Sequence, residues 1–208
     1  YTGNGYANAK FPHGLGVAPK VTIIKNITQS SNSWYVHHAS LGSNTELYLD
    51  TSDEAPATTG NDVTPDATNI QLSGTSSATN GSGTPYIAYC FAEKTGYSKF
   101  GSYVGNGNAD GIFAYTGFKP SWVLIKNSSS AASWTLYDNK RPGYNEDNAY
   151  LITDGSDGEA TDKDIDLISN GFKPRTSNSA LNTSGNTYVY LAFGQSVVGS
   201  NNVPATAR

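Results

Sequence analysis

Short apolar segments separated by turn residues dominate the pattern of hydrophobic and polar positions along this chain. Residues 21–25 and 122–126 are rich in β-branched or aromatic side chains, and each run follows a Gly-x-x-Pro sequence. Short apolar runs bounded by turn residues are typical of buried strands. A second, Trp-containing strand is expected after each run, at residues 34–37 and 134–138.

Two longer strands are predicted at residues 86–93 and 188–195. Side chains alternate between the faces of a strand, and in residues 86–93 both sets are largely apolar, so we expect a central strand of a sandwich. No segment has a convincing helical pattern. Residues 162–169 carry β-branched and turn-prone side chains, which favour a short strand over a helical turn. The sequence therefore predicts an all-β fold.

Several segments recur at a nearly constant spacing of about a hundred residues. Residues 16–26 return at 117–127, residues 80–87 at 182–189, and residues 1–5 at 103–107. Ordered matches at one spacing indicate an internal duplication. We predict two tandem antiparallel β-sandwich modules of jelly-roll or Greek-key type, at residues 1–100 and 101–208, the second with a short C-terminal tail.

Charge and composition argue against two kinds of partner, nucleic acids and membranes. The net charge is −4 and no basic run is present, which argues against nucleic acid, because a phosphate backbone needs a basic stripe. No apolar stretch approaches the roughly twenty residues that span a bilayer, so membrane insertion is not expected. Cys90 is the only cysteine, and its apolar neighbours predict a buried small side chain. The chain opens at Tyr1 and contains no Met, so we expect a processed or trimmed piece of a longer product.

The repeated segments resemble a known protein module. Residues 117–126 (GFKPSWVLIK), 134–141 (WTLYDNKR), 167–173 (LISNGFK) and 96–103 (GYSKFGSY) are similar to a repeated β-module in tail-fibre and other virion surface proteins of tailed bacteriophages, marine and freshwater ones especially. The resemblance covers nearly the whole chain and carries no catalytic signature. It implies a distal tail-fibre or adhesin segment on the virion surface, contacts with other virion proteins, a homotrimer, and a host cell-surface glycan as the partner.

A glycan site is predicted in the loop that contains Arg141, Tyr144 and Asn145, since loops on a rigid sandwich carry recognition. Tyr144 has no counterpart in the first copy and offers a ring for stacking on a sugar. Arg141 can bind the carboxylate of an acidic glycan. Trp34 and Trp134 recur at equivalent positions, which predicts packing in the core instead.

No cofactor is expected apart from a possible calcium ion. Asp154, Asp157, Glu159 and Asp162 are closely spaced among glycines, and Ca²⁺ prefers six to eight oxygen ligands. The alternative for these four residues is a solvated acidic loop. The adjacent His37 and His38 point to opposite faces of a strand, so they are not expected to share a metal.

Other functions remain open beside the adhesin. No nucleophile elbow, zinc-protease motif or phosphate loop is present, so we predict that the protein is not an enzyme. A structural, capsid-decorating or tail-associated virion protein is the first alternative. A capsular-polysaccharide depolymerase would need two acids about 5–9.5 Å apart in a groove. A secreted, lectin-like adhesin is the last alternative.

Overall fold

The structure, a computed structural model, describes residues 1–56, 63–141, 145 and 149–195. Strands form the regular secondary structure of the described residues, which contain no helix. Consequently no helix in these ranges is long and apolar enough to cross a membrane. The chain divides into two compact units, Tyr1–Ala92 (unit 1) and Glu93–Arg208 (unit 2). The predicted all-β fold of antiparallel sheets is confirmed.

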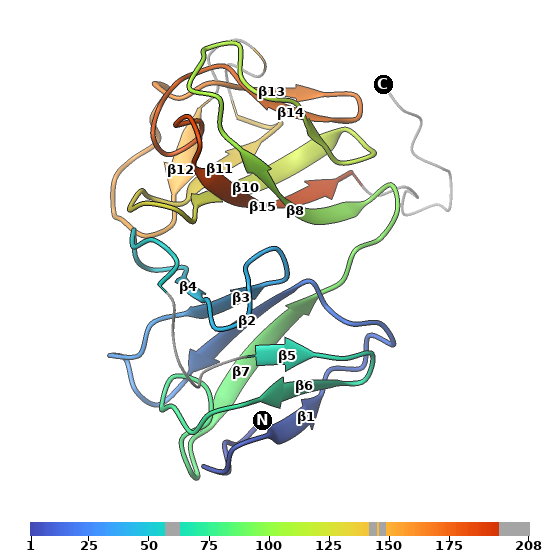
Figure 1. Cartoon of the computed structure of the whole chain (residues 1–208), viewed down its shortest axis with the longest axis vertical. Helices are drawn as coiled ribbons and strands as arrows, with labels where there is room; N and C mark the ends of the chain where they lie inside the picture. The colour runs from blue at the N-terminus through green and yellow to red at the C-terminus, as the bar shows by residue number, and fades with distance from the viewer. Residues whose placement is uncertain (57–62, 142–144, 146–148, 196–208) are drawn as a thin grey trace. The chain divides into compact units, whose positions relative to one another are not determined.

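Unit 1 contains two antiparallel sheets (Figure 1). Its strands are β1 (Ala9–Pro12), β2 (Val21–Asn26), β3 (Tyr35–His38), β4 (Leu47–Tyr48), β5 (Val63–Pro65), β6 (Asn69–Leu72) and β7 (Tyr86–Phe91). One sheet has the order β1-β6-β5 and the other β4-β3-β2-β7. In the second sheet, β2, β3 and β4 follow one another, and β7 returns beside β2, which is a Greek-key arrangement.

Unit 2 has the same plan with one more strand. Its strands are β8 (Ser98–Val104), β9 (Ala114–Tyr115), β10 (Pro120–Asn127), β11 (Thr135–Asp138), β12 (Tyr150–Ile152), β13 (Ile165–Ile168), β14 (Gly171–Pro174) and β15 (Thr187–Gly194). The sheets have the orders β12-β11-β10-β15-β8 and β13-β14-β9. The short strand expected within residues 162–169 is therefore present as β13.

The core of each unit lies between its two sheets. In unit 1, Ile24 and Tyr35 from one sheet pack in one cluster with Ile70 and Leu72 from the other. In unit 2, a larger cluster joins both sheets through Val123, Ile125, Tyr188, Ile165, Leu167 and Phe172. Burial of such side chains is the main favourable contribution to folding, at roughly 25 cal/mol per Å² of apolar surface. Both units are accordingly sandwich-like.

Two details differ from the expectations. The boundary falls between residues 92 and 93 instead of 100 and 101, because β8 pairs along its length with β15 and so belongs to unit 2. The position of β7 also differs in part from the expected central one: β7 ends the order β4-β3-β2-β7, with the start of the chain bonded to its other side through Tyr1, whereas its counterpart β15 lies between β10 and β8.

Residues that the sequence repeat pairs with one another make matching contacts. Tyr1 stacks on Tyr86, with ring centroids 5.1 Å apart, and Tyr103 stacks on Tyr188 at 5.0 Å. Tyr1 and Tyr86 exchange backbone hydrogen bonds, and Tyr103 and Tyr188 are register partners in their ladder. The duplication itself stays a prediction from the sequence, and these contacts describe what the two copies have in common.

Candidate functional site

A groove in unit 2, with a volume of about 450 Å³, combines an exposed ring with charged and hydroxyl groups. We call it the unit 2 groove. It lies between the start of β8 and the end of β9, and its lining is Glu93, Thr95, Gly96, Ser98, Lys99, Tyr115, Thr116 and Gly117. All of these residues belong to one unit, so the local fold of unit 2 builds the groove.

Tyr115 lines this groove, and the ring of Phe113 contacts it. Tyr115 is 62% exposed and Phe113 is 47% exposed, and their rings meet edge to face with centroids 6.3 Å apart. A Cβ atom at Gly171 would lie 2.7 Å from the Phe113 ring and 2.2 Å from the backbone oxygen of Ala114. Glycine at 171 therefore allows β14 and β9 to approach closely and leaves the Phe113 ring in place.

The turn after β9 fixes the position of Tyr115. Gly117 has a φ of +83°, a conformation that favours glycine. The backbone N–H groups of Thr116 and Gly117 both donate to the oxygen of Asn170, at 3.0 and 3.1 Å. Because these bonds hold the turn to the neighbouring loop, the ring of Tyr115 projects from a supported backbone.

The opposite side of the groove carries a pair of charges. Lys99 Nζ lies 3.1 Å from Glu93 Oε1, and the same oxygen accepts the backbone N–H of Phe100 at 3.2 Å. Burial, together with the negative charge of Glu93, raises the pKa of Tyr190 to about 12. The groove thus offers an acceptor carboxylate, a donor ammonium group and an aromatic face within one concave surface.

The predicted glycan loop makes contacts within the protein instead. Arg141 Nε donates to Asp138 at 2.9 Å, and the guanidinium group also pairs with Glu159. Asn145 donates to the backbone oxygen of Leu167 at 3.0 Å and accepts its N–H at 2.7 Å. Arg141 and Asn145 therefore hold neighbouring segments together, and Tyr144 lies outside the described residues.

The four predicted calcium ligands have separate partners. Asp154 accepts the backbone N–H of Trp134 at 3.1 Å, and Glu159 pairs with Arg141. Asp162 accepts the hydroxyl of Tyr150 at 2.5 Å, a bond that lowers the pKa of Asp162. No group of three or more His, Cys, Asp or Glu side chains in the described part of the chain, Asp157 included, is placed to hold a metal ion. The structure therefore does not assemble the predicted site.

The tryptophans, His38 and Cys90, which the sequence analysis also considered, make packing contacts and hydrogen bonds within the protein. Trp134 is buried, as predicted, whereas Trp34 is only half-buried and stacks against Tyr89 with centroids 6.4 Å apart. His38 is fully buried, and its Nδ1 accepts the backbone N–H of Ser40 at 3.1 Å. Cys90 is half-buried, not fully buried as predicted, and this partial burial raises the pKa of its thiol, which lowers the thiolate fraction and the reactivity.

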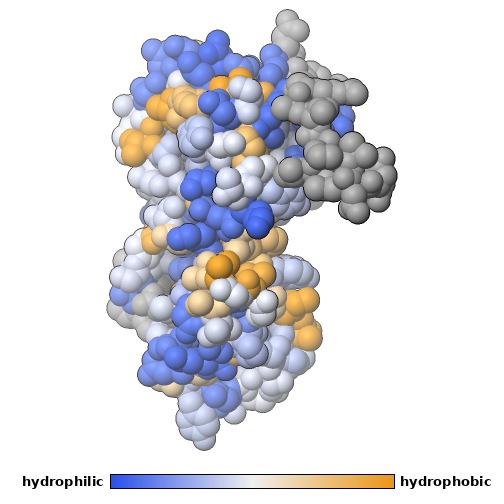
Figure 2. All heavy atoms as spheres, turned by 90° about the vertical axis from the view of Figure 1, so that its right-hand side faces the viewer, coloured by the Kyte–Doolittle hydropathy of each residue, from blue (hydrophilic) through white to orange (hydrophobic). Residues whose placement is uncertain are grey.

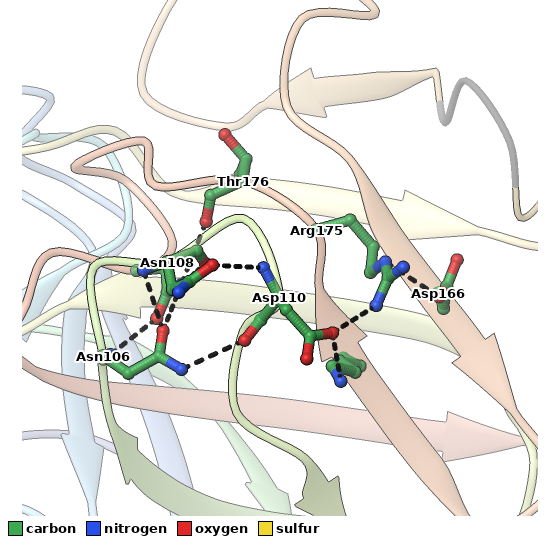
Figure 3. A network of polar contacts seen from close by, with 8 residues as sticks. Asn106, Asn108, Asp110, Asp166, Arg175 and Thr176 are labelled. Carbon is green, nitrogen blue, oxygen red and sulfur yellow. Dashed lines mark hydrogen bonds and ion pairs between the residues drawn. The ribbon is translucent and has the colours of Figure 1, made fainter.

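A second polar cluster surrounds the loop that leads from β8 to β9 (Figure 3). The carboxylate of Asp110 binds Lys173 at 2.6 Å and Arg175 at 2.7 Å, and Arg175 also reaches Asp166 at 3.4 Å. Lys173, followed by Arg175, lowers the pKa of Asp110. Two cations and two carboxylates offset one another, so this cluster ties the loop to β14 and offers no net charge to a ligand.

Sequence reasoning missed the groove residues Glu93, Lys99 and Tyr115, and also Phe113, whose ring contacts Tyr115. The available signal was a difference between the copies, because Tyr115 corresponds to His13 at the spacing of 102 residues. Large side chains that are not repeated are candidates for a surface role, but the sequence does not give their exposure. Figure 2 shows hydrophobic patches on a mostly hydrophilic surface in both units.

Fold and groove together define a class: an all-β sandwich protein of two units, with a ring-lined polar groove in the second. The chain belongs to the family described as a domain of unknown function, DUF7483, whose model matches residues 1–196. A single family model thus extends over both units. Neither the comparison with curated proteins nor the comparison with solved structures found a match.

Proposed function

We propose that this chain is a distal tail-fibre or adhesin segment of a phage virion surface protein, and that its unit 2 groove binds a host cell-surface glycan without chemical reaction. The resemblance to phage virion modules supports the setting. The observation that carries the binding site is the exposed ring of Tyr115 beside the Glu93–Lys99 pair.

Each part of the groove suits a different part of a sugar. The face of an aromatic ring packs against the apolar C–H face of a pyranose, and Tyr adds a hydroxyl that can form hydrogen bonds. Sugar hydroxyls can donate to the Glu93 carboxylate and accept from the Lys99 ammonium group, and hydrogen bonds to charged groups are the stronger kind. Ligand sites in proteins commonly combine such apolar contact with a few convergent polar groups.

The test is binding of the purified protein to host cells and to their isolated surface polysaccharide. Tyr115→Ala removes the ring and is expected to weaken binding about two- to tenfold, from the loss of an aromatic contact of about 0.5–1.5 kcal/mol. Tyr115→Phe keeps the ring and should retain most of the affinity. Tyr6→Ala is the matched control, because Tyr6 is 75% exposed but lies in unit 1.

Two results would contradict the proposal at different levels. Binding that is unchanged by Tyr115→Ala would move the glycan site away from the unit 2 groove. A native protein that binds neither host cells nor their polysaccharide would reject the adhesin function altogether.

The location on a virion and the homotrimer are part of the same proposal. Cryo-electron microscopy of intact particles tests both, with density in threefold groups at the tail tip as the expected result. Density over the capsid, in a copy number that matches the capsid shell, would favour the capsid-decorating alternative instead. Among the described residues, Glu93 alone contributes a carboxyl group to the lining of the groove, whereas the depolymerase alternative requires two.

A further inference from the structure

The outer face of the sheet β13-β14-β9 in unit 2 carries two exposed aromatic rings. Ala114 of β9 and Phe172 of β14 are opposite one another and belong to the core cluster. Because side chains alternate between the two faces of a strand, the neighbouring Phe113 and Tyr115 lie on the outer face. The ring of Phe113 therefore lies beside the unit 2 groove, in edge-to-face contact with Tyr115.

A shift of one residue between the copies accounts for the exposure of Phe113. In unit 1, Phe11 is opposite Ile70 and packs against the core. At the spacing of 102 residues, these two residues correspond to Phe113 and Phe172. Phe172, however, is opposite Ala114. A slip of one residue moves side chains to the other face of a sheet, so the phenylalanine of unit 2 points outward.

This outward ring has its own group of paired charges. Continued by one residue, the register of β9 with β14 places Phe113 opposite Lys173, on the same face of the sheet. Lys173 and Arg175 both bind the carboxylate of Asp110, whose side chain is 72% exposed. Arg175 also reaches Asp166 (Figure 3). A ligand on the Phe113 ring can therefore reach charged hydrogen-bonding groups as well.

Two neighbouring positions on the surface of unit 2 thus have the same composition. At the Tyr115 position, an exposed ring accompanies the Glu93–Lys99 ion pair. At the Phe113 position, an exposed ring accompanies the ion pairs of Asp110. The two ring centroids are 6.3 Å apart, so two consecutive sugars of one chain can each contact a ring.

Charge balance restricts the kind of sugar. Among the described residues, one carboxylate is paired with one ammonium group at the Tyr115 position, and two carboxylates are paired with two cationic groups at the Phe113 position. A charged sugar would lose hydration at such a surface without gaining a net attraction. Uncharged sugars carry hydroxyl groups that donate to carboxylates and accept from cations, so they suit both positions.

We propose that the unit 2 groove and the Phe113 ring together bind at least two consecutive uncharged sugars of a polysaccharide chain, one on Tyr115 and the next on Phe113. This inference rests on the proposed glycan-binding function and specifies the kind of glycan. Phe113, which lies outside the groove lining, becomes a binding residue of its own.

The probes are fragments of the host surface polysaccharide that contain one or two sugars, separated by size and by charge. Calorimetric titration of the whole protein measures the dissociation constant of each fragment. A neutral two-sugar fragment should bind about two- to tenfold more tightly than a neutral single sugar, which is the gain from one further aromatic contact.

Four variants test the role of each position. Phe113→Ala should reduce this gain to less than about twofold, whereas Tyr115→Ala should weaken the binding of the single sugar as well. Phe113→Tyr keeps a ring and should keep the gain. Val104→Ala is the matched control, because Val104 is an exposed apolar residue at the end of β8 away from Lys99.

A fifth variant tests the charge balance. Asp110→Asn leaves the Phe113 position with a net positive charge. It should improve the binding of acidic two-sugar fragments about two- to fivefold, which is the effect of one exposed ion pair.

Three outcomes would overturn this inference and leave the proposed function intact. The first is equal affinity for one and two sugars, and the second is a gain that survives Phe113→Ala. The third is an acidic fragment that binds the natural chain more tightly than the neutral fragment of the same size. By contrast, the absence of binding to every fragment and to the intact polysaccharide would reject the adhesin function itself.

Discussion

Removal of the Asn182 side chain tests how the loop between β8 and β9 is held. Asn182 is fully buried, and its amide nitrogen donates to Asn106 Oδ1, to the backbone oxygen of Asn108 and to that of Thr176, at 2.9, 2.7 and 3.0 Å. Its oxygen accepts the backbone N–H of Asn106 at 2.9 Å. Figure 3 shows this network around the loop.

The expected cost follows from these four contacts. A typical intramolecular hydrogen bond contributes about 0.5–1.5 kcal/mol, and a buried group left unpaired costs about 1–3 kcal/mol. Asn106 and Asn108 are exposed, so water can replace part of what Asn182→Ala removes. We therefore expect a loss of about 2–3 kcal/mol in the unfolding free energy of unit 2.

Urea denaturation monitored by tryptophan fluorescence measures this loss, with hydrogen exchange of the Asn106 amide as a local assay. Asn182→Asp keeps the acceptor oxygen but removes both donors, so it should cost at least as much as the alanine variant. Asn80→Ala is the matched variant in unit 1, where Asn80 holds Tyr6 and Gly74. If both Asn182 variants cost less than about 0.5 kcal/mol, the network does not hold the loop.

Two further predictions concern unit 2. Gly105→Ala should cost about 2 kcal/mol or more in urea denaturation, because its Cβ atom would lie 2.3 Å from the backbone oxygen of Thr183, whereas Gly158→Ala, with no atom within 4 Å, should change stability by less than about 0.5 kcal/mol. Burial and Glu93 raise the pKa of Tyr190 to about 12 from its usual 10, so the stability that Tyr190 contributes is complete below pH 10 and is lost as the pH rises toward 12. Between pH 10 and 12, the unfolding free energy of the natural chain should therefore fall by about 2 kcal/mol more than that of Tyr190→Phe. Equal falls in the two proteins would contradict the raised pKa of Tyr190.

Local patterns predicted the strands because the residues of a buried strand are themselves apolar and bounded by turn residues, so the strand can be recognised from its own sequence. Residues 21–25 and 122–126 are short, apolar and β-branched or aromatic, and they became β2 and β10. The position of a strand within its sheet depends on residues far away in the sequence. β7 and β15 have similar patterns, yet among the described residues β7 ends the order of its sheet and β15 lies between two strands.

The candidate sites could not be predicted in the same way, because exposure and partners are properties of the folded chain. Arg141 was a reasonable ligand for an acidic sugar, but folding brings Asp138 and Glu159 to its guanidinium group. Asp154 and Asp162 were reasonable calcium ligands, but Asp154 accepts a hydrogen bond from Trp134 and Asp162 accepts one from Tyr150. Arg141 keeps 25% of its side chain exposed in its ion pairs, whereas Lys99 keeps 39% in its pair with Glu93, so partners and exposure together decide which charged group a ligand can reach.

One difference between the copies explains why two phenylalanine side chains that the sequence repeat pairs lie in different places. In unit 1, Ala88 leaves space on the inner face of its sheet, and Phe11 packs there against Tyr1, with ring centroids 3.9 Å apart. In unit 2, the ring of Tyr190 lies at the corresponding position, and Phe113, the counterpart of Phe11, is exposed beside Tyr115. Because a close-packed interior has room for one of these rings but not for both, we infer that the choice between alanine and tyrosine decides where the phenylalanine lies. Alanine leaves room for Phe11 beside Tyr1, whereas tyrosine places Phe113 on the surface, in contact with a residue that lines the unit 2 groove.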